Sequence, residues 1–151
     1  MSIIPPFPTN TKEIIESIIN AVGRDATFYV PTLSGCTGSG CSLDPTTDTS
    51  TNSFCEVCSG SYWVKTYSGY TTKAHVTWKF ADFNKWDTGG YVFNGDGIIK
   101  VVYSGSVLDI IEAADYAVID NKEVSLEKIT LLGVPTLNRV IIDFKQKEKE
   151  A

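Results

Sequence analysis

Residues 34–60 read SGCTGSGCSLDPTTDTSTNSFCEVCSG and hold all four cysteines of this 151-residue chain: Cys36, Cys41, Cys55 and Cys58. Most other residues in the segment are Gly, Ser and Thr, so it has few apolar side chains to bury and hydrophobic packing cannot hold it. Structural zinc sites take four Cys or His ligands, often from two close pairs, and the C-x4-C and C-x2-C spacings supply two such pairs. The sequence therefore predicts a loop insertion held by one structural zinc ion on these four thiolates.

The two pairs differ in their local sequence. The stretch from Cys55 to Gly60 resembles a zinc knuckle, with a glycine that lets backbone amides approach sulfur, while Gly38 and Gly40 allow turns with positive φ around the first pair. Two disulfides are an alternative if the protein is exported or oxidised after assembly, and four free thiols are another. A catalytic zinc is not expected, because four thiolates leave no open coordination position.

The composition is that of an ordinary globular chain. With 151 residues and 42% hydrophobic residues, it is long enough for one domain, 1–151, with a real core. We find no run of about 18 apolar residues and no signal-peptide pattern, which predicts no membrane association and synthesis in a reducing cytoplasm. The net charge of −5 disfavours specific binding to nucleic acid, which needs a basic surface.

The N-terminal region predicts an extended arm followed by one helix. Residues 1–9 contain three prolines, and a helix is expected over 10–23, with Asn10 and Glu13 as a capping box and Gly23 as a left-handed stop. An apolar stripe recurs at helical spacing: Ile14, Ile15, Ile18, Ile19 and Val22.

Short β-rich runs separated by turns follow the helix. A clear alternation over 73–78 puts Ala74, Val76 and Trp78 on one face. Other strands are expected at 26–30 (ended by Pro31), 62–67, 91–93, 97–103, 116–119, 123–132 and 137–145, while 107–112 is ambiguous between helix and strand. The pattern predicts a mainly β fold, a small barrel or sandwich with one N-terminal helix, the 34–60 insertion and a charged tail, 145–151.

Enzymatic chemistry has little support in the sequence. His75 is the only histidine, and no serine lies in a G-x-S-x-G motif. The aromatic residues concentrated between 62 and 93 are expected in the core and in a subunit interface, with glycan or single-strand stacking as the alternative. We therefore expect no enzyme.

The order of the elements resembles a family of viral proteins. A helix ending at Gly23-Arg24 leads into a strand, Gly95-Asp96 precedes a β run, residues 114–124 read ADYAVIDNKEV as a hairpin, and 137–141 form a closing strand with Arg139. This order is similar to that of the head-closure (stopper or neck) proteins of tailed bacteriophages. Separately, residues 55–60 are similar to half of the C-x-x-C-x-G-x-G knuckle of zinc-binding J-domain co-chaperones, with Tyr62 in place of the second glycine.

The viral resemblance implies a structural role in the virion, assembled in the host cytoplasm. It implies a homo-oligomeric ring between portal or adaptor and tail-side connector proteins, through which packaged DNA passes without specific binding. The arm 1–9 and the tail 145–151 would then dock neighbouring subunits. The alternative function is a zinc-stabilised module that binds a protein or a glycan, for example through Trp78 or Trp86.

Overall fold

The computed structural model of the chain describes residues 10–79, 96–134 and 136–147. The predicted arm 1–9, the strand 91–93 and the end of the tail lie outside these residues. The chain divides into two compact units, one of which is Val30–Ser68. The other unit comprises the residues up to Tyr29 and those from Gly69 onward.

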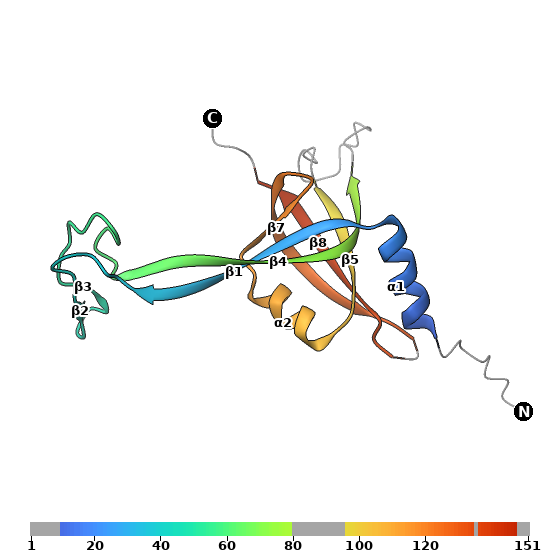
Figure 1. Cartoon of the computed structure of the whole chain (residues 1–151), viewed down its shortest axis with the longest axis horizontal. Helices are drawn as coiled ribbons and strands as arrows, with labels where there is room; N and C mark the ends of the chain where they lie inside the picture. Colours follow the sequence, from blue (N-terminus) through green and yellow to red (C-terminus); the bar gives the residue numbers. More distant parts are fainter. Residues whose placement is uncertain (1–9, 80–95, 135, 148–151) are drawn as a thin grey trace, which may run out of the picture. The chain divides into compact units, whose positions relative to one another are not determined.

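The larger unit is built around a closed six-stranded barrel (Figure 1). Its strand order is β1-β4-β5-β8-β7-β6, and the pairs β1–β6, β4–β5, β5–β8, β6–β7 and β7–β8 are antiparallel. The strands are β1 (Arg24–Gly35), β4 (Trp63–Lys79), β5 (Asp96–Val102), β6 (Tyr116–Ile119), β7 (Lys122–Leu132) and β8 (Arg139–Gln146). The prediction of a mainly β fold with an N-terminal helix is confirmed, and the fold is a barrel.

Alternation along the strands fills the barrel with aliphatic side chains. Every second residue is buried along β5, and along β8 as far as Phe144. Ile99 lies opposite Ile142, and Val101 lies opposite Val140. Ala74 and Val76 are buried as their spacing predicted, because alternate side chains of a strand share one face. The core is thus formed by inward-facing residues from strands that are distant in the sequence.

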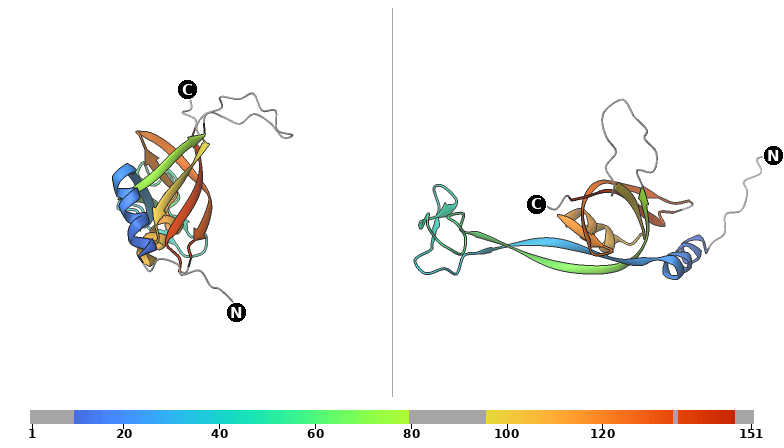
Figure 2. Two further views of the ribbon diagram at one scale, coloured as in Figure 1. Left: turned by 90° about the vertical axis from the view of Figure 1, so that its right-hand side faces the viewer. Right: turned by 90° about the horizontal axis from the view of Figure 1, so that it is seen from above.

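Helix α2 (Gly105–Ala113) closes one end of this barrel, as the view along the barrel in Figure 2 shows. Ser104 begins the helix by accepting a hydrogen bond at its hydroxyl from the Val107 N–H at 3.3 Å. Ile111 is buried in the barrel core, and Val107, Leu108 and Ile110 pack against it. The segment that was ambiguous in the sequence is therefore helical, because its apolar side chains serve as the plug of the barrel.

Helix α1 (Thr11–Val22) packs beside β5, but its ends differ from the prediction. The backbone oxygen of Asn10 accepts from Ile14 N–H at 3.0 Å, whereas the Asn10 side chain makes no capping bond. Gly23 is extended, with φ −74° and ψ 157°, and is not left-handed. A side chain at Gly23 would collide with the Ile19 carbonyl of the last turn of α1 and would also crowd the Ala74 carbonyl of β4, so glycine is needed where the chain leaves the helix.

Pro31 lies inside β1, where the sequence predicted that the strand would end. Strand β1 pairs with β6 only over Ala26–Tyr29, and Pro31 follows that stretch. Proline cannot donate to a ladder, so it is tolerated where one edge of the strand is not paired. This arrangement lets β1 run through proline into the smaller unit.

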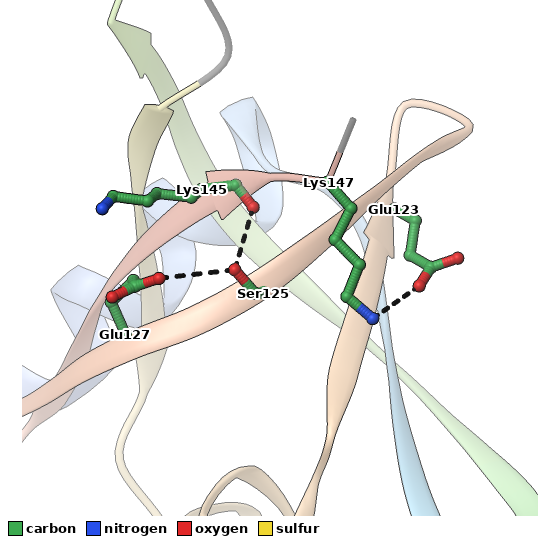
Figure 3. Close-up of polar contacts among 5 residues, drawn as sticks. All are labelled: Glu123, Ser125, Glu127, Lys145 and Lys147. Carbon is green, nitrogen blue, oxygen red and sulfur yellow. Dashed lines mark hydrogen bonds and ion pairs between the residues drawn. The ribbon is translucent and has the colours of Figure 1, made fainter. Parts of the chain in front are cut away.

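The hairpin between β6 and β7 is tight and ends in a polar cluster on β7 and β8. Asp120 and Asn121 have φ values of 51° and 61°, the two left-handed positions that a two-residue type I′ turn requires. Further along, Lys147 Nζ lies 2.7 Å from a Glu123 carboxylate oxygen, and the Ser125 hydroxyl donates to Glu127 or to the Lys145 carbonyl, each at 3.4 Å (Figure 3). The register between β7 and β8 shifts here, which is typical of a β-bulge.

Candidate metal centre

The four cysteines belong to the smaller unit, Val30–Ser68. Within this unit the Thr66 hydroxyl donates to the Thr32 carbonyl at 3.2 Å, and the Ser34 hydroxyl donates to the Val64 carbonyl at 3.4 Å, which ties β1 to β4. The Cys36 N–H donates to the Tyr62 carbonyl at 2.8 Å. This last bond brings the start of the cysteine segment next to its end.

A small hairpin brings the two cysteine pairs together. Strands β2 (Leu43–Asp44) and β3 (Thr49–Ser50) pair antiparallel, so the chain reverses between Cys41 and Cys55. The turn begins with the Asp44 carboxylate, which accepts from Thr46 N–H at 2.8 Å. That bond, with others from Thr46 and Thr47, lowers the pKa of Asp44 despite the opposing effect of burial.

The four Sγ atoms form one cluster and all lie within 4.8 Å of one another. The Sγ atoms of Cys36 and Cys55 are 3.6 Å apart, and those of Cys41 and Cys58 are also 3.6 Å apart. A tetrahedral zinc site with Zn–S bonds of about 2.3 Å has S–S edges of about 3.8 Å. The sulfur positions therefore fit a single tetrahedral ion.

The distances do not fit disulfide bonds. A disulfide requires sulfur atoms about 2.0 Å apart, and both short separations are far longer. The four cysteines are free thiols in the structure. Each of these short contacts links one member of the first pair to one of the second, so an ion at the centre would join the two ends of the segment.

Glycine is required at the centre because sulfur atoms pass close to the backbone. A Cβ atom on Gly38 would lie 2.7 Å from Cys55 Sγ and 3.2 Å from Cys36 Sγ. Gly40 has the expected positive φ of 71°. Gly38 was also expected to have a positive φ but is needed for a different reason, because a side chain there would collide with the sulfur atoms. Its N–H donates to Cys36 Sγ at 3.3 Å, a bond that stabilises a thiolate.

The residues after Cys58 turn the backbone around its sulfur. Ser59, Gly60 and Tyr62 have φ values of 50°, 87° and 66°. A positive φ is rare for a bulky side chain such as that of Tyr62. The strain at Tyr62 is offset locally, because its N–H donates to Cys58 and its carbonyl accepts from Cys36 N–H.

Hydrogen bonds from nearby N–H groups, together with burial and the neighbouring thiols, give the cysteines different pKa values. Burial disfavours the Cys58 thiolate, but the N–H groups of Tyr62 and Gly60 and the thiols of Cys41 and Cys36 outweigh it and lower the pKa of Cys58 to about 6. For Cys36, the Gly38 N–H lowers the pKa, yet burial and the three other thiols prevail and raise it to about 12. Four thiols this close together cannot all lose their protons, because the negative charges would repel one another. A divalent cation bound between them would neutralise part of that charge and allow all four to bind as thiolates.

Two residues at this centre were not identified from the sequence. Ser50 is buried, its hydroxyl lies 2.9 Å from Cys41 Sγ, and it accepts from Asn52 N–H at 3.0 Å. Tyr62 was expected to begin a strand and instead takes the left-handed position that glycine has in the knuckle motif. In the sequence, the sign of the role of Tyr62 was its place at the second glycine of the knuckle motif. Ser50 could not be recognised, because serine is frequent throughout residues 34–60.

The other candidate residues lie in the barrel unit. His75 is opposite Lys100 on β5 and lies near Arg139, with no carboxylate among the residues that line this site. The Trp78 indole donates to Asp120 at 3.0 Å, and its ring packs edge-on against Phe144. Trp86 lies outside the described residues. These positions do not come together as a catalytic group within the described chain.

Neither described helix is long and apolar enough to span a membrane. Comparisons with protein-family models, with curated proteins and with solved structures found no match to this chain.

Proposed function

We propose that Cys36, Cys41, Cys55 and Cys58 bind one structural zinc ion. The observation that carries this proposal is the pair of 3.6 Å sulfur separations in a cluster of four free thiols. Zinc favours tetrahedral thiolate ligation, and backbone N–H groups directed at the sulfurs offset the negative charge of four thiolates. The ion would supply the cross-link that the segment, with little else to bury, needs in order to fold.

The wider function proposed is that of a structural virion protein, a head-closure subunit acting in a homomeric ring between portal or adaptor and tail. Support comes from the resemblance of the element order to head-closure proteins. The 114–124 segment that contributed to this resemblance is an antiparallel hairpin within a closed barrel. A barrel of this kind gives a connector a rigid body, and packaged DNA would pass an acidic chain without specific binding.

Deletion of the gene from a virus that carries it tests this role. The expected phenotype is an accumulation of separate tails and of heads that lose their DNA, restored by the wild-type gene supplied in trans. Antibody against the chain should label the junction of head and tail in complete particles. Normal particle yield and morphology after deletion would contradict the proposal.

The second candidate, a metal-stabilised protein-binding module, is favoured by one specific observation. Phe54 and Val57 lie on either side of Cys55 and are 93% and 55% exposed, and two exposed apolar side chains so near each other in the chain suit contact with a partner. Glycan stacking through Trp78 is less favoured, because its ring is covered by Phe144 and by the Lys122 ammonium 5.0 Å from the ring centre.

A further inference from the structure

An exposed, largely apolar surface lies next to the second pair of cysteines. We call Phe54, Glu56 and Val57 the knuckle tip; Phe54 is 93% exposed and Val57 is 55% exposed. The flanking Cys55 and Cys58 are buried in the sulfur cluster. The Phe54 N–H donates to the Asn52 side chain at 3.1 Å, and the Ser59 N–H donates to the Cys55 carbonyl at 2.8 Å. The tip is therefore a pre-ordered surface with two apolar side chains and one carboxylate.

A second exposed surface lies on the barrel unit beside α1. A groove of about 230 Å³, which we call the α1 groove, is lined by Ile15, Ile18, Ile19, Val22, His75, Lys100 and Arg139. Its helix side is aliphatic, and its strand side holds two cations and a histidine. Ile18 and Val22 are 55% and 57% exposed, so this face of α1 is largely uncovered.

The cations of the α1 groove lack partners among the described residues. Arg24, Lys73 and Lys147 each form an ion pair, whereas neither Lys100 nor Arg139 forms one with a described residue. The Nε atom of Arg139 is buried and has no hydrogen-bond partner in the described part of the chain. An unpaired buried donor is costly, and the positive charges of Lys100 and Arg139 suit a ligand that brings a carboxylate to this groove. It is also a local cationic site on a chain of net charge −5.

We propose that the knuckle tip of one chain docks into the α1 groove of a second copy. Phe54 and Val57 would contact the isoleucines of α1, and the Glu56 carboxylate would pair with Lys100 and Arg139. The groove is below the range of about 300–1,000 Å³ of small-molecule pockets and suits one or two protruding side chains. Apolar surface meets apolar surface, and the single acid of the tip meets the free cations.

A second copy is favoured as the occupant because one chain carries both halves of the contact. Such an interface is heterologous: each subunit offers its tip to one neighbour and its groove to another, and the assembly closes as a ring when the rotation permits. The proposal rests on the homo-oligomeric part of the proposed function and identifies the surfaces involved.

The test measures oligomeric state by mass photometry and sedimentation velocity on the full-length, zinc-loaded chain. Phe54→Ser removes the tip and Ile18→Ser alters the groove. Leu33→Ser is the matched control in the smaller unit, and Ile14→Ser is the matched control on α1, since both are exposed apolar residues outside the proposed contact. Circular dichroism and metal content establish that each variant is folded.

We expect wild type and both controls to assemble, and each contact variant to weaken association at least tenfold. Mixing Phe54→Ser with Ile18→Ser chains should yield two-chain complexes that grow no further, because each variant keeps the half that the other lacks. Glu56→Lys and Lys100→Glu should each weaken assembly, and the double variant should regain part of it.

Three results would overturn the proposal. They are a wild type that stays monomeric, contact variants that assemble like wild type, and contact variants that do not associate when mixed. A wild-type monomer would assign the groove to an acidic, apolar segment of another protein. If rings form without the knuckle tip, the docking proposal fails but the proposed connector role does not. If the chain assembles through the tip but is absent from virions, the connector role fails but the docking proposal does not.

Discussion

Tyr62 shows how one residue adapts the backbone to the metal centre. Its φ of 66° is easy for glycine and asparagine but costly for a β-branched side chain, which is stiff next to the backbone. We expect Tyr62→Val to weaken zinc binding at least tenfold in competition with a chelator, while Tyr62→Asn retains more affinity. Equal loss in both variants would show that the ring of Tyr62, rather than its backbone conformation, maintains the centre.

Gly97 performs a packing role at the residue scale. A Cβ atom there would lie 2.5 Å from both the Phe144 ring and the Thr77 carbonyl, with no room in the barrel wall. Gly97→Ala should therefore lower the free energy of unfolding by about 1–3 kcal/mol in urea denaturation, as overpacked cores do. Gly105→Ala, where a side chain would meet nothing within 4 Å, is the control and should be neutral or slightly stabilising.

Asp120 makes part of the stability depend on pH. Partial burial opposes its ionisation, but the Trp78 indole and the Arg24 guanidinium bond its carboxylate and, with Lys122, lower its pKa. Because the folded pKa lies below the unfolded value of about 3.9, the stabilisation is complete above about pH 5 and is lost as the pH falls through the unfolded and then the folded pKa.

Asp120→Asn keeps the turn and removes the charge. It should destabilise the protein at pH 7 by no more than about 1 kcal/mol, since the pair with Arg24 is partly exposed. Denaturation of both proteins at pH 7 and at pH 2.5 measures the difference. A gap between them that does not shrink at the lower pH would contradict the assigned ion pair.

At the scale of elements, helix α1 has one buried residue, Ile19. Ile19 is 4% exposed, whereas Ile18 is 55% exposed. Ile19→Ala should cost about 2–5 kcal/mol of unfolding free energy, and Ile18→Ala should change it by less than about 1 kcal/mol. Thermal denaturation of the two variants checks this, and a similar cost for both would mean that α1 packs differently.

The same helix shows what periodicity can and cannot predict. The spacing predicted its apolar stripe and its bounds to within one residue at each end. It could not show which isoleucines face the barrel, because the stripe is wider than the contact. Gly23 was expected to be left-handed, yet it is extended, and a side chain there would collide with the Ile19 carbonyl and crowd that of Ala74, a residue 51 positions away that no local pattern connects to it.

At the scale of the whole molecule, the sequence predicted the positions of strands and the grouping of the cysteines better than it predicted the backbone between them. Alternation located β6 at its observed bounds and located β5 and β7 to within one residue, because burial on one face imposes a period of two. The spacing of the cysteines predicted a common centre. The continuation of β1 through Pro31 and the left-handed Tyr62 depend on contacts between distant segments, so local propensity failed at both.

The central claim concerns the metal, and native mass spectrometry of the untagged protein tests it most directly. The native mass should exceed the denatured mass by one zinc ion per chain, and Cys58→Ser should lose that excess. A metal-free native mass with a denatured mass lower by about four hydrogens would mean two disulfides and would contradict the account.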